Sequence, residues 1–128
     1  MVLDAARSVV TVIEHFGRGE DHHLEFTGFV VGLESDHIAN QTTRKRITVL
    51  TCYNDFTSQS DPNPKLQVLL PNGSVFEAKL LFFNAHYDVA LLEILAESSD
   101  DLPLQLPSFG SNPNYGQEVL VLGRDDHS

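Results

Sequence analysis

Asp88 is the charged residue whose sequence context most strongly suggests a functional role. It begins the segment 88–94, in which nearly every following residue is apolar, as in a strand buried on most of its positions. Removing a carboxylate from water is unfavourable unless it is paired or hydrogen-bonded, so partners should lie close to it. Asp88 is therefore a candidate site residue, and other parts of the chain must supply its partners.

A second group of polar side chains has the chemistry needed to bind a metal ion. It consists of Glu20, Asp21, His22, His23 and Glu25. Adjacent histidines at the entry to a strand point to opposite faces, and no second cluster has a matching spacing. A loop with incidental histidines is the better interpretation, and neither a metal site nor a cofactor is predicted.

Two further motifs carry weaker signals. Cys52 is the single cysteine, which excludes an internal disulfide, and we expect a buried, inert thiol. The Gly17-x-Gly19 pair is followed by a polar loop and a strand instead of a helix, so it does not indicate a nucleotide site.

The elements that position Asp88 begin with an antiparallel hairpin. Apolar residues alternate over 66–70, Pro71-Asn72-Gly73 provides a tight turn, and residues 75–83 return as the partner strand. A second turn at 84–86 leads directly to Asp88. In this arrangement Phe82 and Phe83 are expected to be core and rim residues.

Further strands are predicted at 9–16, 24–33 and 47–52, with polar loops at 35–46 and 57–65 and a last strand at 118–123. Gly28 lies inside the second of these strands and suggests a close approach of another part of the chain. No segment requires a helix. Short strands separated by turns favour an all-β sandwich or barrel.

The composition limits the class of partner. The 128 residues include 18 acidic and 8 basic side chains, which gives a formal charge of −10 and would repel nucleic acid and anionic membranes. The basic run 44–46 is interpreted as a solvated loop. With one cysteine and no apolar leader segment, an intracellular location is expected.

Four segments together resemble the N-terminal half of a trypsin-like serine protease domain of the Deg/HtrA family. They are SVVTVIEHF, FTGFVVGL, ITVLTCYN and LLPNGSVFEAKLLFFNAHYDVALLEI. The resemblance implies an antiparallel six-stranded barrel, the first barrel of the trypsin-like fold, over residues 1–117. Residues 118–128 would begin a second barrel that is missing or reduced to one strand. Asp88 falls at the position of the family's triad aspartate, and Asn54 falls at that of its triad histidine. The resemblance thus places the two side by side, and we expect the Asn54 amide N–H to donate to the Asp88 carboxylate.

The resemblance also implies that the catalytic machinery is incomplete. An asparagine amide has no basic lone pair with which to accept the serine proton. The family's Gly-x-Ser-Gly nucleophile has no counterpart among these 128 residues. We therefore expect a pseudoenzyme that binds protein or peptide, with possible self-association through an exposed sheet edge. The alternative is a fragment of a serine-type endopeptidase whose nucleophile lies in sequence not present here.

Overall fold

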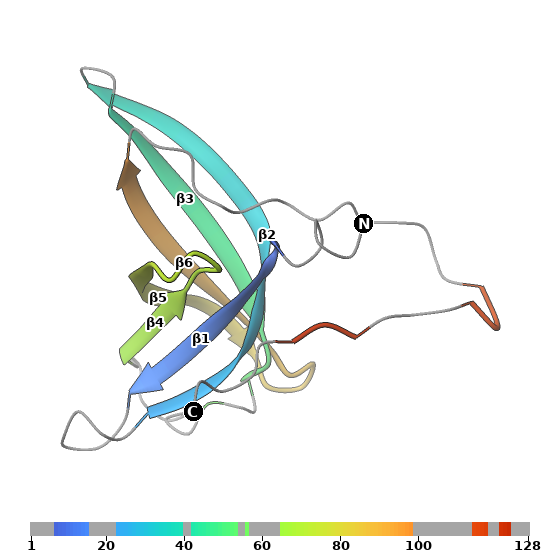
Figure 1. The fold of residues 1–128 in the computed structure, drawn as a ribbon. Coiled ribbons are helices and arrows are strands. Elements are labelled where there is room, and N and C mark those ends of the chain that lie inside the picture. Colours follow the sequence, from blue (N-terminus) through green and yellow to red (C-terminus); the bar gives the residue numbers. More distant parts are fainter. Residues whose placement is uncertain are drawn as a thin grey trace.

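Six strands make up most of the part of the chain that the structure describes (Figure 1). The computed structural model describes residues 7–15, 23–39, 42–53, 56, 65–98, 114–117 and 121–123. The strands are β1 (Val9–His15), β2 (His23–Ala39), β3 (Thr42–Thr51), β4 (Lys65–Leu69), β5 (Val75–Asn84) and β6 (Val89–Ser98). Within the described residues no helix is long and apolar enough to cross a membrane.

The strands close into an antiparallel barrel in the order β1-β2-β3-β6-β5-β4. Closure depends on the pairing of β1 with β4, in which Thr11 lies opposite Leu69 and His15 opposite Lys65. Each of the six strands therefore has two neighbours over part of its length, which closes the sheet. Among the described strands, residues 32–39 of β2 and 94–98 of β6 pair with β3 alone. The predicted all-β, six-stranded antiparallel barrel is confirmed.

The core fills the barrel interior with small branched side chains from every other position of the strands. The alternation places one set of side chains inside and the other set outside. Fully or almost fully buried positions include Val10 and Val12 of β1, Ile47 and Val49 of β3, Leu66 and Val68 of β4, and Leu92 and Ile94 of β6. Aromatic rings add a cluster to this core: Phe56 packs against Phe26 and Tyr53, and Tyr53 stacks on Phe83 with ring centroids 4.5 Å apart.

Gly28 occupies a place in this interior that no larger residue fits. A Cβ atom there would lie 2.8 Å from Val49 Cγ1 and 2.9 Å from Val12 Cγ2. Real Cβ atoms essentially never approach carbon so closely, because the optimum separation is about 3.5–4.0 Å. The close approach expected at Gly28 is confirmed.

The turn between β4 and β5 forms where the sequence predicts it. Gly73 has a φ of 91°, a conformation that side chains with a Cβ rarely adopt. The Ser74 N–H donates to Asn72 Oδ1 at 3.0 Å, and the Leu70 N–H donates to the Ser74 carbonyl at 2.8 Å. The asparagine and glycine thus set the register of the hairpin that follows.

The predicted polar loop at 35–46 is wrong. β2 and β3 continue as a paired hairpin, in which Glu34 lies opposite Arg46 and Ser35 opposite Lys45. β6 also runs further than expected, to Ser98, so that β2, β3 and β6 extend together beyond the other strands (Figure 1). The Arg46 guanidinium lies 3.6 Å from Glu34 and 3.7 Å from Glu93. Side chains of opposite charge face each other across these strands and stabilise the pairing. Because they occupy positions where apolar residues would otherwise alternate, the extension lacks the pattern by which a strand is usually detected.

The last predicted strand, 118–123, falls partly outside the described residues. Residues 118–120 are not described, and residues 121–123 are not in a strand. Val121 is 94% exposed, so in this structure its side chain is not part of a sheet-covered core. The boundary at residue 117 and the beginning of a second barrel stay predictions.

Candidate functional site

Asp88 ends the turn that connects β5 to β6, one residue earlier than the strand itself begins. Its φ of 58° lies in the left-handed region, which few residues other than glycine adopt, and aspartate is one of those that do. The turn is held on one side by the Tyr87 N–H, which donates to Asn84 Oδ1 at 3.1 Å. On the other side, the Tyr53 N–H approaches the Asp88 carbonyl at 3.4 Å. The backbone at Asp88 is therefore tied to the end of β3.

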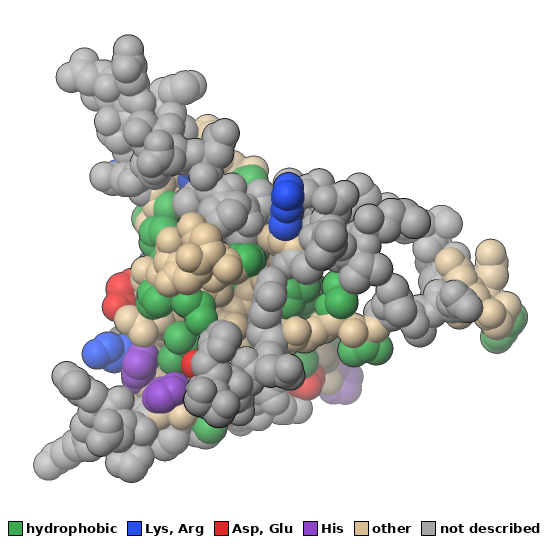
Figure 2. Space-filling model, in the orientation of Figure 1, with side chains coloured by type: hydrophobic (Ala, Val, Ile, Leu, Met, Phe, Trp, Pro, Cys, Tyr) green, Lys and Arg blue, Asp and Glu red, His purple; other side chains and the backbone are tan. Residues whose placement is uncertain are grey.

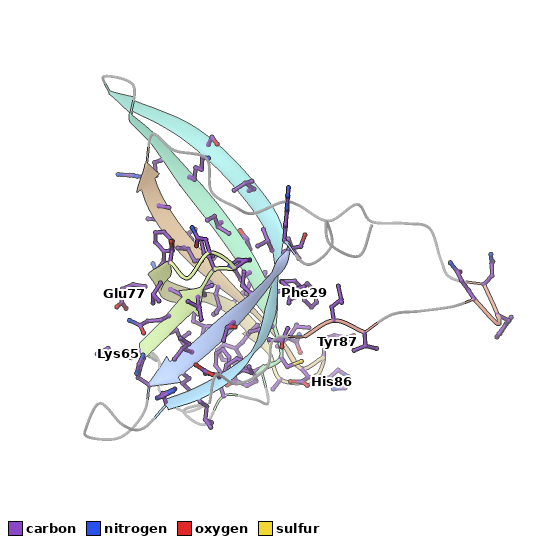
Figure 3. The ribbon with its side chains drawn as sticks, in the orientation of Figure 1. Phe29, Lys65, Glu77, His86 and Tyr87 are labelled. Atoms are coloured by element: carbon purple, nitrogen blue, oxygen red, sulfur yellow. The ribbon has the colours of Figure 1, made fainter. Side chains whose placement is uncertain are left out.

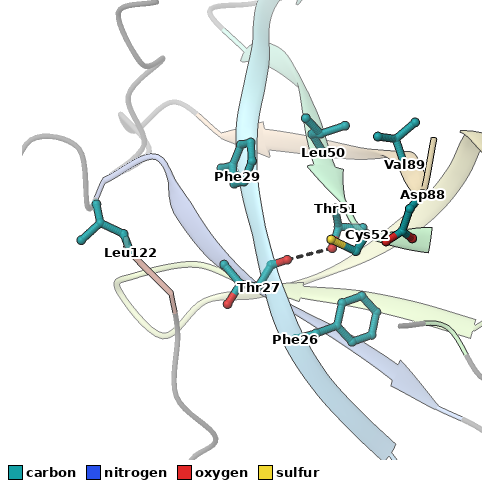
Figure 4. Close-up of a pocket in the computed structure, with 9 residues that line it drawn as sticks. All are labelled: Phe26, Thr27, Phe29, Leu50, Thr51, Cys52, Asp88, Val89 and Leu122. Atoms are coloured by element: carbon teal, nitrogen blue, oxygen red, sulfur yellow. Dashed lines mark hydrogen bonds between the residues drawn. The ribbon is translucent and has the colours of Figure 1, made fainter. Parts of the chain in front are cut away.

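The Asp88 side chain lies at a pocket on the outer side of the barrel (Figure 4). The pocket has a volume of about 510 Å³. Its walls are largely apolar and come from β2, the end of β3, the start of β6 and the C-terminal segment: Phe26, Thr27, Phe29, Leu50, Thr51, Cys52, Asp88, Val89 and Leu122. A largely apolar pocket with few polar groups is typical of a binding site.

Asn54, the predicted partner of Asp88, lies outside the described residues. Tyr53, the residue before Asn54, is described. The Tyr53 N–H approaches the Asp88 carbonyl, so the chain just after β3 lies next to the turn before β6. The pairing of the Asn54 amide with the Asp88 carboxylate stays a prediction.

Cys52 is exposed, so the prediction of a buried thiol is wrong. The preceding residue, Thr51, is buried, and its hydroxyl donates to the Thr27 carbonyl at 2.8 Å. Because successive side chains of a strand point to opposite faces, Cys52 is directed outward, where it lines the pocket together with Asp88. The alternation along residues 47–52 was the signal that could have placed it.

An apolar row that was not predicted from the sequence crosses the outer face of the barrel next to this pocket. Phe29 of β2 lies opposite Leu50 of β3, Leu50 opposite Leu91 of β6, and Leu91 opposite Phe82 of β5. We call these four residues the outer apolar row. Phe29 is 41% exposed and Phe82 is 52% exposed, so Phe82 is not a core residue. With adjacent strands about 4.8 Å apart, the row spans roughly 14 Å.

The C-terminal segment already places an apolar side chain against this surface. Leu122 lines the pocket together with Phe29. A Cβ atom on Gly123 would lie 3.3 Å from Thr27 Oγ1, so the segment runs close along β2. A polypeptide segment can therefore place a leucine side chain at the wall of the pocket beside β2.

The described residues thus form a closed antiparallel β-barrel with a pocket beside the turn that precedes β6. The family model for the trypsin-like peptidase domain matches residues 26–128, and the chain belongs to this family. No curated protein is significantly similar to it. The family assignment confirms the trypsin-like part of the resemblance, whereas the Deg/HtrA subtype and the loss of catalytic residues stay predictions.

Proposed function

We propose that this chain is a non-catalytic, Deg/HtrA-like member of the trypsin-like family that binds protein or peptide at the outer apolar row and the adjoining pocket. The observation that carries the proposal is the row itself, because four apolar side chains in register on an outer barrel face are unusual unless something packs on them. The proposed ligand is an extended polypeptide with apolar side chains. Leu122, an apolar side chain of a polypeptide segment that lines the pocket, supports this choice.

We favour binding by packing of ligand side chains on the outer apolar row over binding by addition of a ligand strand to the sheet. Addition of a strand requires an unpaired sheet edge, and Phe29, Leu50 and Leu91 of the row are each paired with a strand on both sides. Self-association through an exposed edge stays a proposal for the segment 118–123, outside the barrel. An intracellular location likewise stays a proposal.

The absence of catalysis rests on the residues at the triad positions. Asn54 stands where the family has its general base, and an amide cannot accept the proton of a serine hydroxyl. These 128 residues also contain no Gly-x-Ser-Gly segment. Loss of one triad member typically lowers the rate by roughly 10⁴-fold.

A second candidate function is a serine-type endopeptidase to which this chain contributes one barrel. Asp88 favours it, because the resemblance assigns Asp88 to the triad aspartate and its backbone is held in a constrained turn beside the end of β3. That enzyme would need a substitute base and a nucleophile from other sequence.

One pair of assays separates these functions. The wild-type chain and Asn54→His are treated with a serine-directed fluorophosphonate probe and with casein, beside an intact trypsin-like enzyme. We expect neither labelling nor cleavage, because restoring a base does not supply a nucleophile or an oxyanion hole. Stoichiometric labelling of one serine, or cleavage that the probe abolishes, would show that the chain is an enzyme.

Binding is tested with the same unfolded casein, labelled with a fluorophore. Phe29→Ser should weaken binding by about 10-fold or more, as expected for a central aromatic contact. Leu95→Ser is the matched control, because Leu95 is 49% exposed on β6 but does not belong to the outer apolar row. Equal losses in the two variants, or no binding by the wild-type chain, would contradict the proposed binding surface.

A further inference from the structure

Two histidines from different strands meet at the end of the barrel where β1 leads to β2. His15, the last residue of β1, lies directly opposite His23, the first residue of β2. Their ring centroids are 6.1 Å apart and the rings are inclined by 46°. Figure 2 shows two neighbouring histidine side chains on the face where a basic side chain also lies. His23 is exposed and His15 is half-buried, so both rings can be reached from solvent.

A chain of hydrogen bonds determines which nitrogen of His15 is available. His15 Nε2 lies 2.7 Å from Gln67 Oε1, and Gln67 Nε2 donates to Glu77 Oε1 at 3.1 Å. An ionised carboxylate only accepts hydrogen bonds, so Glu77 requires the NH₂ group of Gln67 on its side. The amide oxygen of Gln67 then faces His15, whose Nε2 must carry the proton, and the lone pair remains on Nδ1. Figure 3 labels Glu77 at the far end of this chain and the neighbouring Lys65.

Histidines that bind metals commonly have a hydrogen bond of this kind on their second ring nitrogen. A metal-binding imidazole usually donates its other N–H to a carbonyl or carboxylate, which fixes its tautomer and raises its basicity as a ligand. Here Gln67 Oε1 accepts the hydrogen bond from His15 Nε2–H, and Glu77 accepts one from the NH₂ group of the same Gln67 amide and polarises it. The relay spans β1, β4 and β5, so the orientation of the His15 ring is fixed by the barrel itself.

The separation of the two rings suits a shared ion. With metal–nitrogen bonds of about 2.0–2.1 Å, two imidazole centroids on one tetrahedral ion lie roughly 5–5.5 Å apart. The observed 6.1 Å exceeds this range only slightly, and a rotamer adjustment of the exposed His23 ring would close the difference.

We propose that His15 and His23 form a binding site for a divalent transition-metal ion of the kind that imidazole favours, such as Zn²⁺ or Cu²⁺. Among the described residues no three His, Cys, Asp or Glu side chains are grouped to hold a metal ion, so solvent oxygens complete the coordination. The formal charge of −10 favours cation binding in general. Lys65 lies opposite His15 in the pairing of β1 with β4, and its positive charge disfavours cation binding at this site.

The experiment measures Zn²⁺ binding by calorimetry in a Cys52→Ser background, which removes the exposed thiol as a competing ligand. The parent should bind Zn²⁺ with a dissociation constant tighter than about 1 mM. His15→Gln and His23→Gln should each weaken this binding by at least about 10-fold, because even the loss of a residue that only orients a ligand has effects of that size. Lys65→Gln should tighten it.

His86→Gln is the matched control. His86 is an exposed histidine in the turn before β6, in edge-to-face contact with Tyr87, and its removal should leave the affinity unchanged. Circular dichroism establishes that each variant is folded. If His23→Gln binds Zn²⁺ as well as the parent, or if the parent does not bind, the proposal is wrong.

A measurement on the unmodified chain tests the proposal independently of any variant. Substoichiometric Cu²⁺ should broaden the imidazole proton resonances of two of the six histidines before the others. Assignment of those two to His15 and His23 supports the site, whereas uniform broadening of all six overturns it.

Discussion

Replacement of Gly28 by alanine tests the packing of the barrel interior most directly. The added methyl group would lie 2.8 Å from Val49 Cγ1, 2.9 Å from Val12 Cγ2 and 3.3 Å from the Leu50 carbonyl oxygen. Both valine side chains are completely buried. Because β-branched side chains have few accessible χ1 rotamers, neither valine can rotate away without strain.

The magnitude follows from two opposing effects. Overpacking a close-packed core destabilises by about 1–3 kcal/mol, and two contacts below 3.0 Å place Gly28→Ala within that range. Alanine loses less backbone entropy than glycine on folding, and this difference offsets about 0.5–1 kcal/mol of the destabilisation. We therefore expect a net loss of about 1–2 kcal/mol in the free energy of unfolding.

Urea denaturation followed by circular dichroism measures this loss. With a slope of about 2 kcal/mol per molar urea, the middle of the typical range, the midpoint should fall by roughly 0.5–1 M while the slope stays the same. Gly32→Ala is the control, because its nearest contacts would be at 3.1 Å to the half-buried Thr48 side chain, and its loss should be smaller. In a Val49→Ala background Gly28→Ala should be less harmful, since one clash is removed. An unchanged midpoint for Gly28→Ala, or an equal loss in both backgrounds, would refute the packing argument.

Two further substitutions test the surroundings of Asp88. Asn54→Leu should lower stability by about 1–3 kcal/mol if the asparagine amide donates to the Asp88 carboxylate, and an unchanged denaturation midpoint would mean that the two do not meet. Thr51→Val should lower stability by about 1 kcal/mol, because the buried hydroxyl that donates to the Thr27 carbonyl is lost. Thr48→Val, at a half-buried position three residues earlier in β3, is the comparison for the second substitution and should have a smaller effect.

The local features of the fold were readable from the sequence because they depend on neighbouring residues. Asn72 and Gly73 set a turn through the conformations that they tolerate and the hydrogen bond from Ser74. The period-2 alternation of branched residues identified the cores of β1 to β6, and a glycine inside an apolar strand indicated the close contact at Gly28. Asp88 was found for the same reason, since a carboxylate beside an apolar run is visible without any tertiary structure.

The ends of the strands and the composition of the surfaces required the tertiary structure. The pairing of Glu34 with Arg46 continues a hairpin that has no apolar alternation, so its physical basis, charge complementarity across strands, appears only once the register is fixed. The exposure of Cys52 likewise depends on which face of β3 is directed toward the barrel interior.

The two proposed binding surfaces were also decided by the fold alone. The outer apolar row joins residues of β2, β3, β6 and β5, and Phe29 and Phe82 are far apart in sequence. The relay behind His15 reaches Gln67 only because β1 pairs with β4 when the barrel closes. A sequence pattern specifies the face on which a side chain lies along its own strand. Which side chains become neighbours across strands is determined by the order and register in which the strands pair.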